Sequence, residues 1–160
     1  MVDNVIIRKA TIKDLENIQN LNKKLFIREF EKYNKLLNVE WTFGEKGTKY
    51  FSDLIQNDFV YIAEVDNKVV GYLAGSIHNI NVCFTEQFAE IENMYIERDY
   101  RGLKIGTKLI IKFKEYCKEN KVKHIKVSAW SENIEAIKFY EKNCFEDYEK
   151  TLVCKLEEKL

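Results

Sequence analysis

The sequence predicts an α/β fold in which a mixed, mostly antiparallel central sheet is flanked by helices on both faces. Two apolar segments joined by Asp66 and Asn67 predict a β-hairpin in the first half of the chain. Further along, apolar strand-like segments alternate with amphipathic helical ones, and such helices pack on the faces of a sheet. With 160 residues and 46% apolar content, the whole chain (1–160) is expected to form a single domain around one core.

The elements follow from hydrophobic periodicity. Residues 5–10 predict a short strand, and Thr11 with Asp14 predicts a capped helix start. Residues 26–57 predict two helices around a loop, because "NVEWTFGEKG" interrupts the helical pattern there. The remaining predictions are strands at 59–65, 68–80, 87–96 and 124–130, helices at 105–120 and 133–142, and a last strand or pair of strands over 145–156.

Composition excludes several classes of protein. Lys plus Arg and Asp plus Glu both number 26, so zero net charge implies no general affinity for nucleic acid or for anionic membranes. No apolar run approaches the roughly 20 residues that span a bilayer. The four cysteines form no C-x-x-C pair and the N-terminal sequence lacks a signal-peptide pattern, which favours a soluble, cytoplasmic protein with reduced thiols.

A basic turn connects the strand at 87–96 to the helix at 105–120. The first turn of a helix has backbone N–H groups without intrahelical partners, and these donors together with the helix dipole favour an anion. Gly102 and Gly106 allow close backbone approach, while Arg101, Lys104 and Lys108 add positive charge. The turn therefore predicts a phosphate site.

Four interpretations of this turn compete. A P-loop requires four residues between its glycines followed by Lys and then Ser or Thr, whereas Gly102 and Gly106 are separated by three residues and Thr107 precedes Lys108. A dinucleotide fingerprint requires three glycines and a location directly after the first strand. This turn has neither the three glycines nor that location. An exposed basic loop without a ligand remains the simplest alternative, and the fourth interpretation is a coenzyme A turn.

Residues 101–106, "RGLKIG", resemble the coenzyme A turn [QR]-x-x-G-x-[GA] of the GNAT superfamily of N-acetyltransferases, with Lys104 at the first glycine of the motif. A second segment, "SENIEAIKFYEKNCF" (131–145), resembles the pattern N-x-x-A-x-x-[FL]-Y-x-x-x-G-F, with Cys144 at its glycine. This segment matches at Asn133, Ala136, Phe139, Tyr140 and Phe145. Two motifs in the family's order are more specific than either alone, and the resemblance extends from about residue 5 to 155.

The resemblance implies acetyl-CoA as the acyl donor and a set of residues that bind it. Backbone groups of Met94, Tyr95 and Ile96 would pair with the pantetheine arm and present an N–H to the oxyanion. Tyr140 would act as the general acid that protonates the departing thiolate. The other implied coenzyme-binding residues are Arg101, Gly102, Leu103, Lys104, Ile105, Gly106, Thr107, Asn133 and Phe139, with Tyr140.

Two carboxylates are candidates for the general base. Glu90 and Glu92 are two residues apart on a strand and so point to the same face. In a partly enclosed cleft, repulsion between them would make proton abstraction easier near neutral pH. We favour Glu90 over Glu92; the alternative is that both face solvent.

The acceptor is predicted only as a primary amine of a small molecule, peptide or protein. The aromatic residues within 26–51, together with Glu29, Glu31 and Glu40, could receive a cationic amine. His78 and His124 have no ligand-like neighbours in the sequence, so we expect no metal. A homodimer is possible, and a catalytically silent acyl-CoA sensor is the alternative function, although the presence of Tyr140 and two candidate bases disfavours it.

Overall fold

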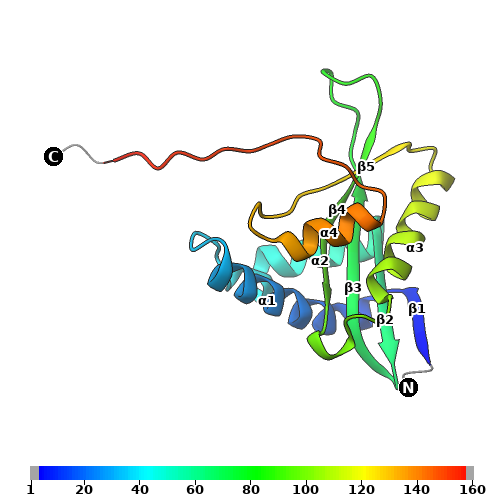
Figure 1. Cartoon of the computed structure of the whole chain (residues 1–160). Helices are drawn as coiled ribbons and strands as arrows, with labels where there is room; N and C mark the ends of the chain where they lie inside the picture. The colour runs from blue at the N-terminus through cyan, green and yellow to red at the C-terminus, as the bar shows by residue number, and fades with distance from the viewer. Residues whose placement is uncertain (1–3, 158–160) are drawn as a thin grey trace.

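The computed structural model describes residues 4–157, which form a five-stranded sheet flanked by four α-helices (Figure 1). The strands lie in the order β1-β2-β3-β4-β5. The first four are antiparallel to their neighbours, and β5 is parallel to β4. Their bounds are β1 Val5–Lys9, β2 Phe59–Val65, β3 Lys68–Ile77, β4 Phe88–Ile96 and β5 His124–Val127. The predicted mixed, mostly antiparallel sheet is confirmed.

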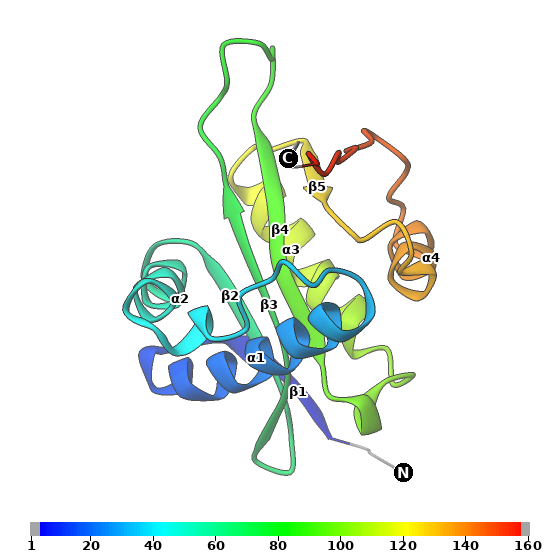
Figure 2. The same ribbon diagram turned by 90° about the vertical axis from the view of Figure 1, so that its left-hand side faces the viewer.

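The helices cover both faces of this sheet, as predicted (Figure 2). One face packs against α1 (Leu15–Lys32) and α2 (Glu45–Asn57), in a cluster that includes Ile18, Phe51 and Tyr72. The other face packs against α3 (Ile105–Glu119) through a second cluster that includes Phe113. The short helix α4 (Ile134–Lys142) follows β5 and contributes partly buried aromatic side chains to the second cluster. None of the helices within residues 4–157 is both long and apolar enough to cross a membrane.

A β-bulge in β4 changes which side chains share a face. Ala74 pairs with Asn93 but Gly75 pairs with Ile91, so Glu92 is the extra residue. Because of this insertion, Glu92 and Asn93 both project toward the α1/α2 face, which a regular strand does not allow. The bulge therefore gathers polar groups on one side of the sheet.

Pairing between β4 and β5 covers only part of β4. The four register pairs run from Phe88–His124 to Ile91–Val127, where β5 ends. The rest of β4, residues 92–96, has no strand partner on its β5 side within the described chain. The sheet is consequently open along this stretch.

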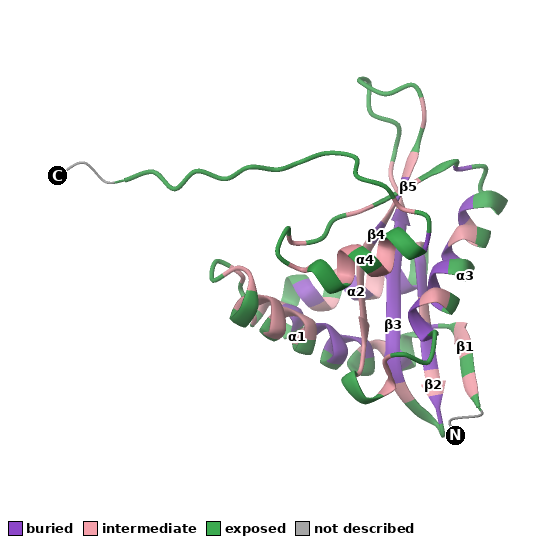
Figure 3. Cartoon of the chain, viewed as in Figure 1, coloured by how far each residue is buried: buried purple, intermediate pink, exposed green. Residues whose placement is uncertain are grey.

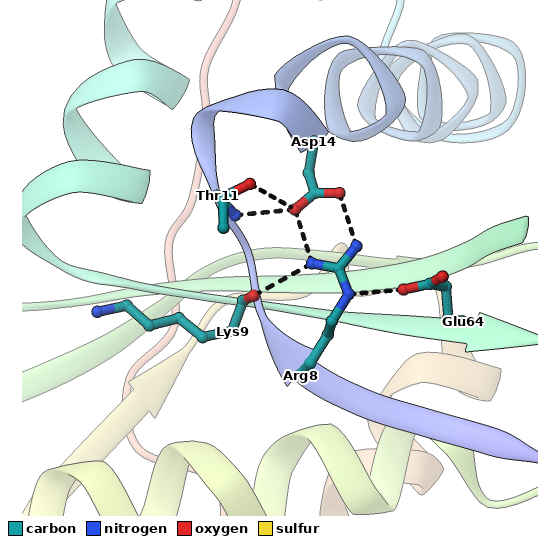
Figure 4. Close-up of polar contacts among 5 residues, drawn as sticks. All are labelled: Arg8, Lys9, Thr11, Asp14 and Glu64. Atoms are coloured by element: carbon teal, nitrogen blue, oxygen red, sulfur yellow. Dashed lines mark hydrogen bonds and ion pairs between the residues drawn. The ribbon is translucent and has the colours of Figure 1, made fainter. Parts of the chain in front are cut away.

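The start of α1 is held by an ion-pair network on the α1/α2 face (Figure 4). Asp14 accepts a hydrogen bond from the backbone N–H of Thr11, as the predicted capping pattern requires. Both carboxylate oxygens of Asp14 accept from the Arg8 guanidinium at 2.8 and 2.9 Å, and Arg8 also donates to Glu64 at 2.6 Å. The hydrogen bonds from Arg8 hold the pKa of Asp14 below its usual value.

The predicted strand or strand pair over 145–156 is wrong. Residues 143–157 form no helix or strand, and nearly all of them are exposed (Figure 3). The later part of this segment extends away from the sheet (Figure 1). The apolar alternation is present, but the described chain supplies no neighbouring strand, and a strand requires one for its backbone hydrogen bonds. Two other strands are shorter than predicted, since β3 ends at Ile77 and β5 at Val127.

Candidate active site

The basic turn before α3 has the geometry of an anion site. Lys104 is the N-cap of α3 and makes no side-chain capping hydrogen bond. The first helical bond runs from Lys108 N–H to the Lys104 carbonyl at 3.0 Å, so the N–H groups of Ile105, Gly106 and Thr107 precede the first intrahelical donor. These three donors are available to a ligand at the helix start.

Lys104 adopts the left-handed backbone conformation, with φ 61° and ψ 17°. Glycine reaches this region without strain and lysine does not, which explains the glycine of the family motif at this position. Gly102 also has a positive φ of 82°, and a Cβ there would meet nothing within 4 Å. Both residues shape the turn.

Gly106 also has a packing role that the sequence did not predict. A Cβ at this position would lie 2.8 Å from the Phe139 ring of α4. Gly106 therefore allows α4 to pack directly on α3, and a larger residue here would require the Phe139 ring to move. The side chain of Ile105 is buried in the core, so this residue offers the site only its backbone.

Beside the turn lies a basic pocket. Arg101 donates to the Ile96 carbonyl at 3.0 Å and its guanidinium lies 5.3 Å from the centre of the Tyr95 ring, which fixes its direction. The pocket has a volume of about 450 Å³ and is lined by Arg28, Lys32, Tyr95, Arg98, Arg101 and Glu135. Four cations against one carboxylate favour an anionic ligand.

Tyr140 lies on α4. The helix is capped by Asn133, whose side chain accepts from the Ala136 N–H at 3.1 Å, and it is followed by Cys144 in the left-handed conformation, with φ 70°. Asn133 thus acts in capping, and Cys144 occupies a conformation suited to the glycine of the family pattern. Burial, and then the charge of Glu29, raise the pKa of Tyr140 above its ordinary value, so its hydroxyl stays protonated at neutral pH.

Glu90 and Glu92 belong to a polar cluster at the end of β3. The His78 Nε2 atom lies 3.0 Å from a Glu92 oxygen and 3.3 Å from a Glu90 oxygen, and the Ser76 hydroxyl donates to Glu92. Lys126 on β5 lies 3.8 Å from Glu90. The interpretation of His78 as an isolated histidine is wrong, because the β3–β4 register brings it beside both carboxylates.

These three residues also form a possible metal-binding set, although we expect no metal. One ligand atom from each of His78, Glu90 and Glu92 lies within 4.8 Å of the others. Imidazole and carboxylate are ligands that zinc accepts. In the structure the same atoms are occupied by the hydrogen bonds and charge contacts among these residues, Ser76 and Lys126.

A separate buried hydrogen-bond chain lies at the centre of the α1/α2 face. The Tyr72 hydroxyl, fully buried, receives a hydrogen bond from Asn22 at 2.9 Å and donates to Asn93 at 2.5 Å. The Asn93 amide donates in turn to the Tyr50 hydroxyl at 3.1 Å. Burial, followed by the charge of Glu92, raises the pKa of Tyr50, which indicates that Tyr50 lies close to the carboxylates.

Sequence reasoning missed several of these polar residues. These are Asn22, Tyr72, Ser76, His78 and Asn93, which face the candidate site or support it. Tyr50, which bonds to Asn93, was among the aromatic residues expected near the acceptor. The alternation of Ser76, on β3, and His78, directly after it, was the available signal. It could be used only with the register of β3 against β4, which depends on the loop between them and on the bulge.

Comparison with known proteins shows the family. The family model described as the acetyltransferase (GNAT) family matches residues 16–144. The chain belongs to this family.

Among curated proteins, an uncharacterized N-acetyltransferase of Methanocaldococcus jannaschii is 31% identical over 153 residues, covering 93% of this chain. The chain spans 64% of that relative's length.

Solved structures have the same fold. A mutant protein from Bacillus halodurans superposes with a TM-score of 0.84 at 18% identity, covering 95% of this chain and 99% of that one. A predicted acetyltransferase from Clostridium acetobutylicum, solved with acetyl-CoA, gives a TM-score of 0.77 at 24% identity, covering 95% and 96%.

Proposed function

We propose that this protein transfers the acetyl group of acetyl-CoA to a primary amine of a small molecule, peptide or protein. The observation that carries the proposal is the position of the open stretch of β4, residues 92–96. It begins beside the carboxylate cluster and ends just before the turn that presents free N–H donors. One extended acetyl-CoA molecule could lie along this edge, with its phosphates at the turn and its thioester near the carboxylate cluster.

Different residues of the candidate site bind different parts of coenzyme A. The N–H groups of Ile105, Gly106 and Thr107 receive the pyrophosphate, and the basic pocket around Arg98 and Arg101 holds further phosphate charge. Backbone groups of Met94, Tyr95 and Ile96 pair with the pantetheine arm as a neighbouring strand would. No metal takes part.

The chemistry requires a base, an oxyanion donor and an acid. A carboxylate of the cluster removes a proton from the ammonium, and the free amine attacks the thioester carbonyl carbon. A backbone N–H of the open stretch stabilises the oxyanion. When the tetrahedral intermediate collapses, the C–S bond breaks, the Tyr140 hydroxyl protonates the thiolate, and the amide and free CoA leave.

The contacts favour Glu92 over Glu90 as the base. Glu92 lies at the bulge, where the open stretch of β4 begins, whereas Glu90 lies in the part of β4 that β5 covers. Lys126 of β5 also stands 3.8 Å from Glu90, on the covered side of the strand.

The test is amine-dependent release of free CoA from acetyl-CoA, measured with polyamines, aminoglycosides, amino acids and N-terminal peptides. Tyr140→Phe keeps the ring and removes the hydroxyl, so kcat should fall by roughly 10² to 10⁴ while coenzyme A affinity survives. Tyr148→Phe, at an exposed tyrosine, is the matched control and should have the parent rate.

Two outcomes would contradict the proposal. Tight binding of coenzyme A without turnover of any amine would instead support a silent acyl-CoA sensor. A Tyr140→Phe variant at the parent rate would remove the assigned acid, and the thiolate would then leave unprotonated or take its proton from water.

A further inference from the structure

Three side chains that can bind a metal converge at the loop end of β3 and β4. His78 follows directly after β3, and Glu90 and Glu92 lie on β4, so the pairing of the two strands brings them together. Among the His, Cys, Asp and Glu residues of the described chain, no other group of three places its ligand atoms this close together. The expectation of no metal depended on His78 having no ligand-like neighbour in the sequence, and the fold supplies two.

The separations of the ligand atoms are close to those of a zinc site. Nitrogen and oxygen ligands at about 2.0 to 2.2 Å from a tetrahedral zinc ion lie about 3.4 Å from one another. The His78 Nε2 atom lies 3.0 Å from a Glu92 oxygen and 3.3 Å from a Glu90 oxygen. Small side-chain rotations would therefore place one ion among the three atoms and leave its fourth position to water.

The charge around these atoms also favours a cation. Among residues 4–157, Lys126 is the one lysine or arginine with a nitrogen within 4.0 Å of either glutamate, and it lies 3.8 Å from Glu90 alone. Burial raises the pKa of Asp58, at the end of α2, and the charge of Glu92 adds to the rise, so a third carboxyl group lies nearby. The cluster is thus short of positive charge.

The cluster is accessible to an ion from solvent. The side chains of His78, Glu90 and Glu92 are 40%, 21% and 24% exposed, so each is partly enclosed and none is sealed off. A nitrogen ligand separates this set from sites for magnesium or calcium, which are built from oxygen atoms. One imidazole and two carboxylates suit zinc and similar transition-metal ions.

We propose that His78, Glu90 and Glu92 bind a zinc ion, and that the bound ion switches off acetyl transfer. Both candidate bases are ligands of the ion, so neither has a free oxygen pair to remove a proton from the acceptor. The ion is therefore an inhibitor and not a participant in the reaction. Only its inhibitory effect depends on the proposed function, because the metal site itself requires no turnover.

Binding is measured by isothermal titration of the full chain with zinc chloride, after treatment with a chelator. The exposed thiols of Cys83, Cys144 and Cys154 are alkylated first, so that thiolates do not bind the metal. One ion should bind per chain, and magnesium chloride at 1000-fold excess should not compete. Equal binding of magnesium would reduce the site to a general acidic patch and overturn the proposal.

The two histidines of the chain provide a matched pair of variants. His78→Ala leaves both carboxylates in place and should weaken zinc binding at least tenfold, since one of three ligands is lost. His124→Ala is the control, because the His124 Nε2 atom lies 2.6 Å from a Glu86 oxygen and forms a similar pair with only one carboxylate. It should bind zinc within twofold of the parent, and circular dichroism checks that both variants are folded.

Inhibition is measured in the acetyl-transfer assay, with each variant compared with its own rate in the absence of zinc. Zinc should inhibit the parent and His124→Ala at the same concentrations, and addition of a chelator should restore the rate. His78→Ala should require at least tenfold more zinc. The inhibition should be competitive with the amine and not with acetyl-CoA, because the ligands lie at the acceptor end of the open stretch.

Three results would overturn the proposal. Failure of the alkylated chain to bind zinc at 100-fold excess over protein would remove the site, and equal weakening in both histidine variants would place the ion elsewhere. Zinc bound through His78 without any loss of rate would remove the inhibitory effect. A chain that binds zinc through His78 but acetylates no amine would confirm the site and contradict only the proposed function.

Discussion

The two faces of the sheet carry different kinds of side chain. The α3 face is an apolar cluster in which Phe113 packs against Gly75 so closely that a Cβ there would lie 2.5 Å from its ring. The α1/α2 face contains three separate polar groups along the sheet: the Arg8 network, the Tyr72 chain and the carboxylate cluster. One face stabilises the fold and positions the turn before α3, and the other holds the groups proposed to move protons.

Between the two faces of the sheet, the largest effect is expected at the carboxylate cluster. Glu92→Gln keeps the shape of the side chain and removes its basicity, so kcat/KM should fall by roughly 10² to 10³, with loss of the acidic limb of the pH profile. Glu90→Gln is the matched control at the same face and should lose less than tenfold. The reverse order would make Glu90 the base, as the sequence alone favoured.

A substitution on the apolar α3 face should lower the stability of the protein and leave kcat nearly unchanged. Phe113→Ala removes a fully buried ring from the centre of the α3 cluster, so the free energy of unfolding should fall by about 3 to 5 kcal/mol. Denaturant titration measures this loss, and kcat measured at a temperature where the variant stays folded should change little. A kcat that falls as far as in Glu92→Gln would erase the proposed division between the faces.

Charge in the Arg8 network makes a smaller, pH-dependent contribution to the free energy of unfolding. Because hydrogen bonds from Arg8 lower the pKa of Asp14 in the folded protein, its stabilisation is present above the unfolded pKa of about 3.9. It is lost as the pH falls through the lower folded pKa. Asp14→Asn should therefore reduce the free energy of unfolding by about 2 kcal/mol at pH 7 and by much less near pH 3.

Unfolding by denaturant at several pH values checks this prediction for Asp14. A gap between parent and variant that stays constant with pH would mean that packing, not charge, accounts for the effect. Acetyl transfer should be unchanged in this variant, because the Arg8 network lies at the opposite edge of the sheet from β5.

The smallest effect is expected at the turn before α3. Lys104→Gly relieves the left-handed backbone, and the greater freedom of glycine in the unfolded chain offsets part of the gain, so stability should rise by less than about 1 kcal/mol. Lys104→Ala keeps the strain. Both variants remove one cation, so both should weaken coenzyme A binding by about 1 kcal/mol or less, with a smaller loss at high salt.

Calorimetry of coenzyme A binding and thermal unfolding of the same two variants separate charge from conformation at Lys104. Abolished binding in Lys104→Ala would show that the side-chain charge outweighs the backbone donors of the turn.

Local patterns were predictable from sequence, and pairings between distant segments were not. The cap at Asp14 and the turn at 101–106 depend on neighbouring residues, and both are in the structure. The bulge at Glu92 and the approach of His78 depend on register, which a period-2 pattern leaves open. The segment 145–156 has the pattern of a strand, but a single sequence does not say where its partner is.

The open stretch of β4 has a consequence for hydrogen exchange. Along residues 92–96, amides bonded to β3 exchange with deuterium only when the sheet opens, whereas those directed toward β5 have no strand to protect them. Adjacent residues of one strand should therefore exchange at rates that differ by orders of magnitude. Bound acetyl-CoA would slow the fast amides, so the difference between neighbours along β4 measures how much of the stretch the pantetheine arm occupies.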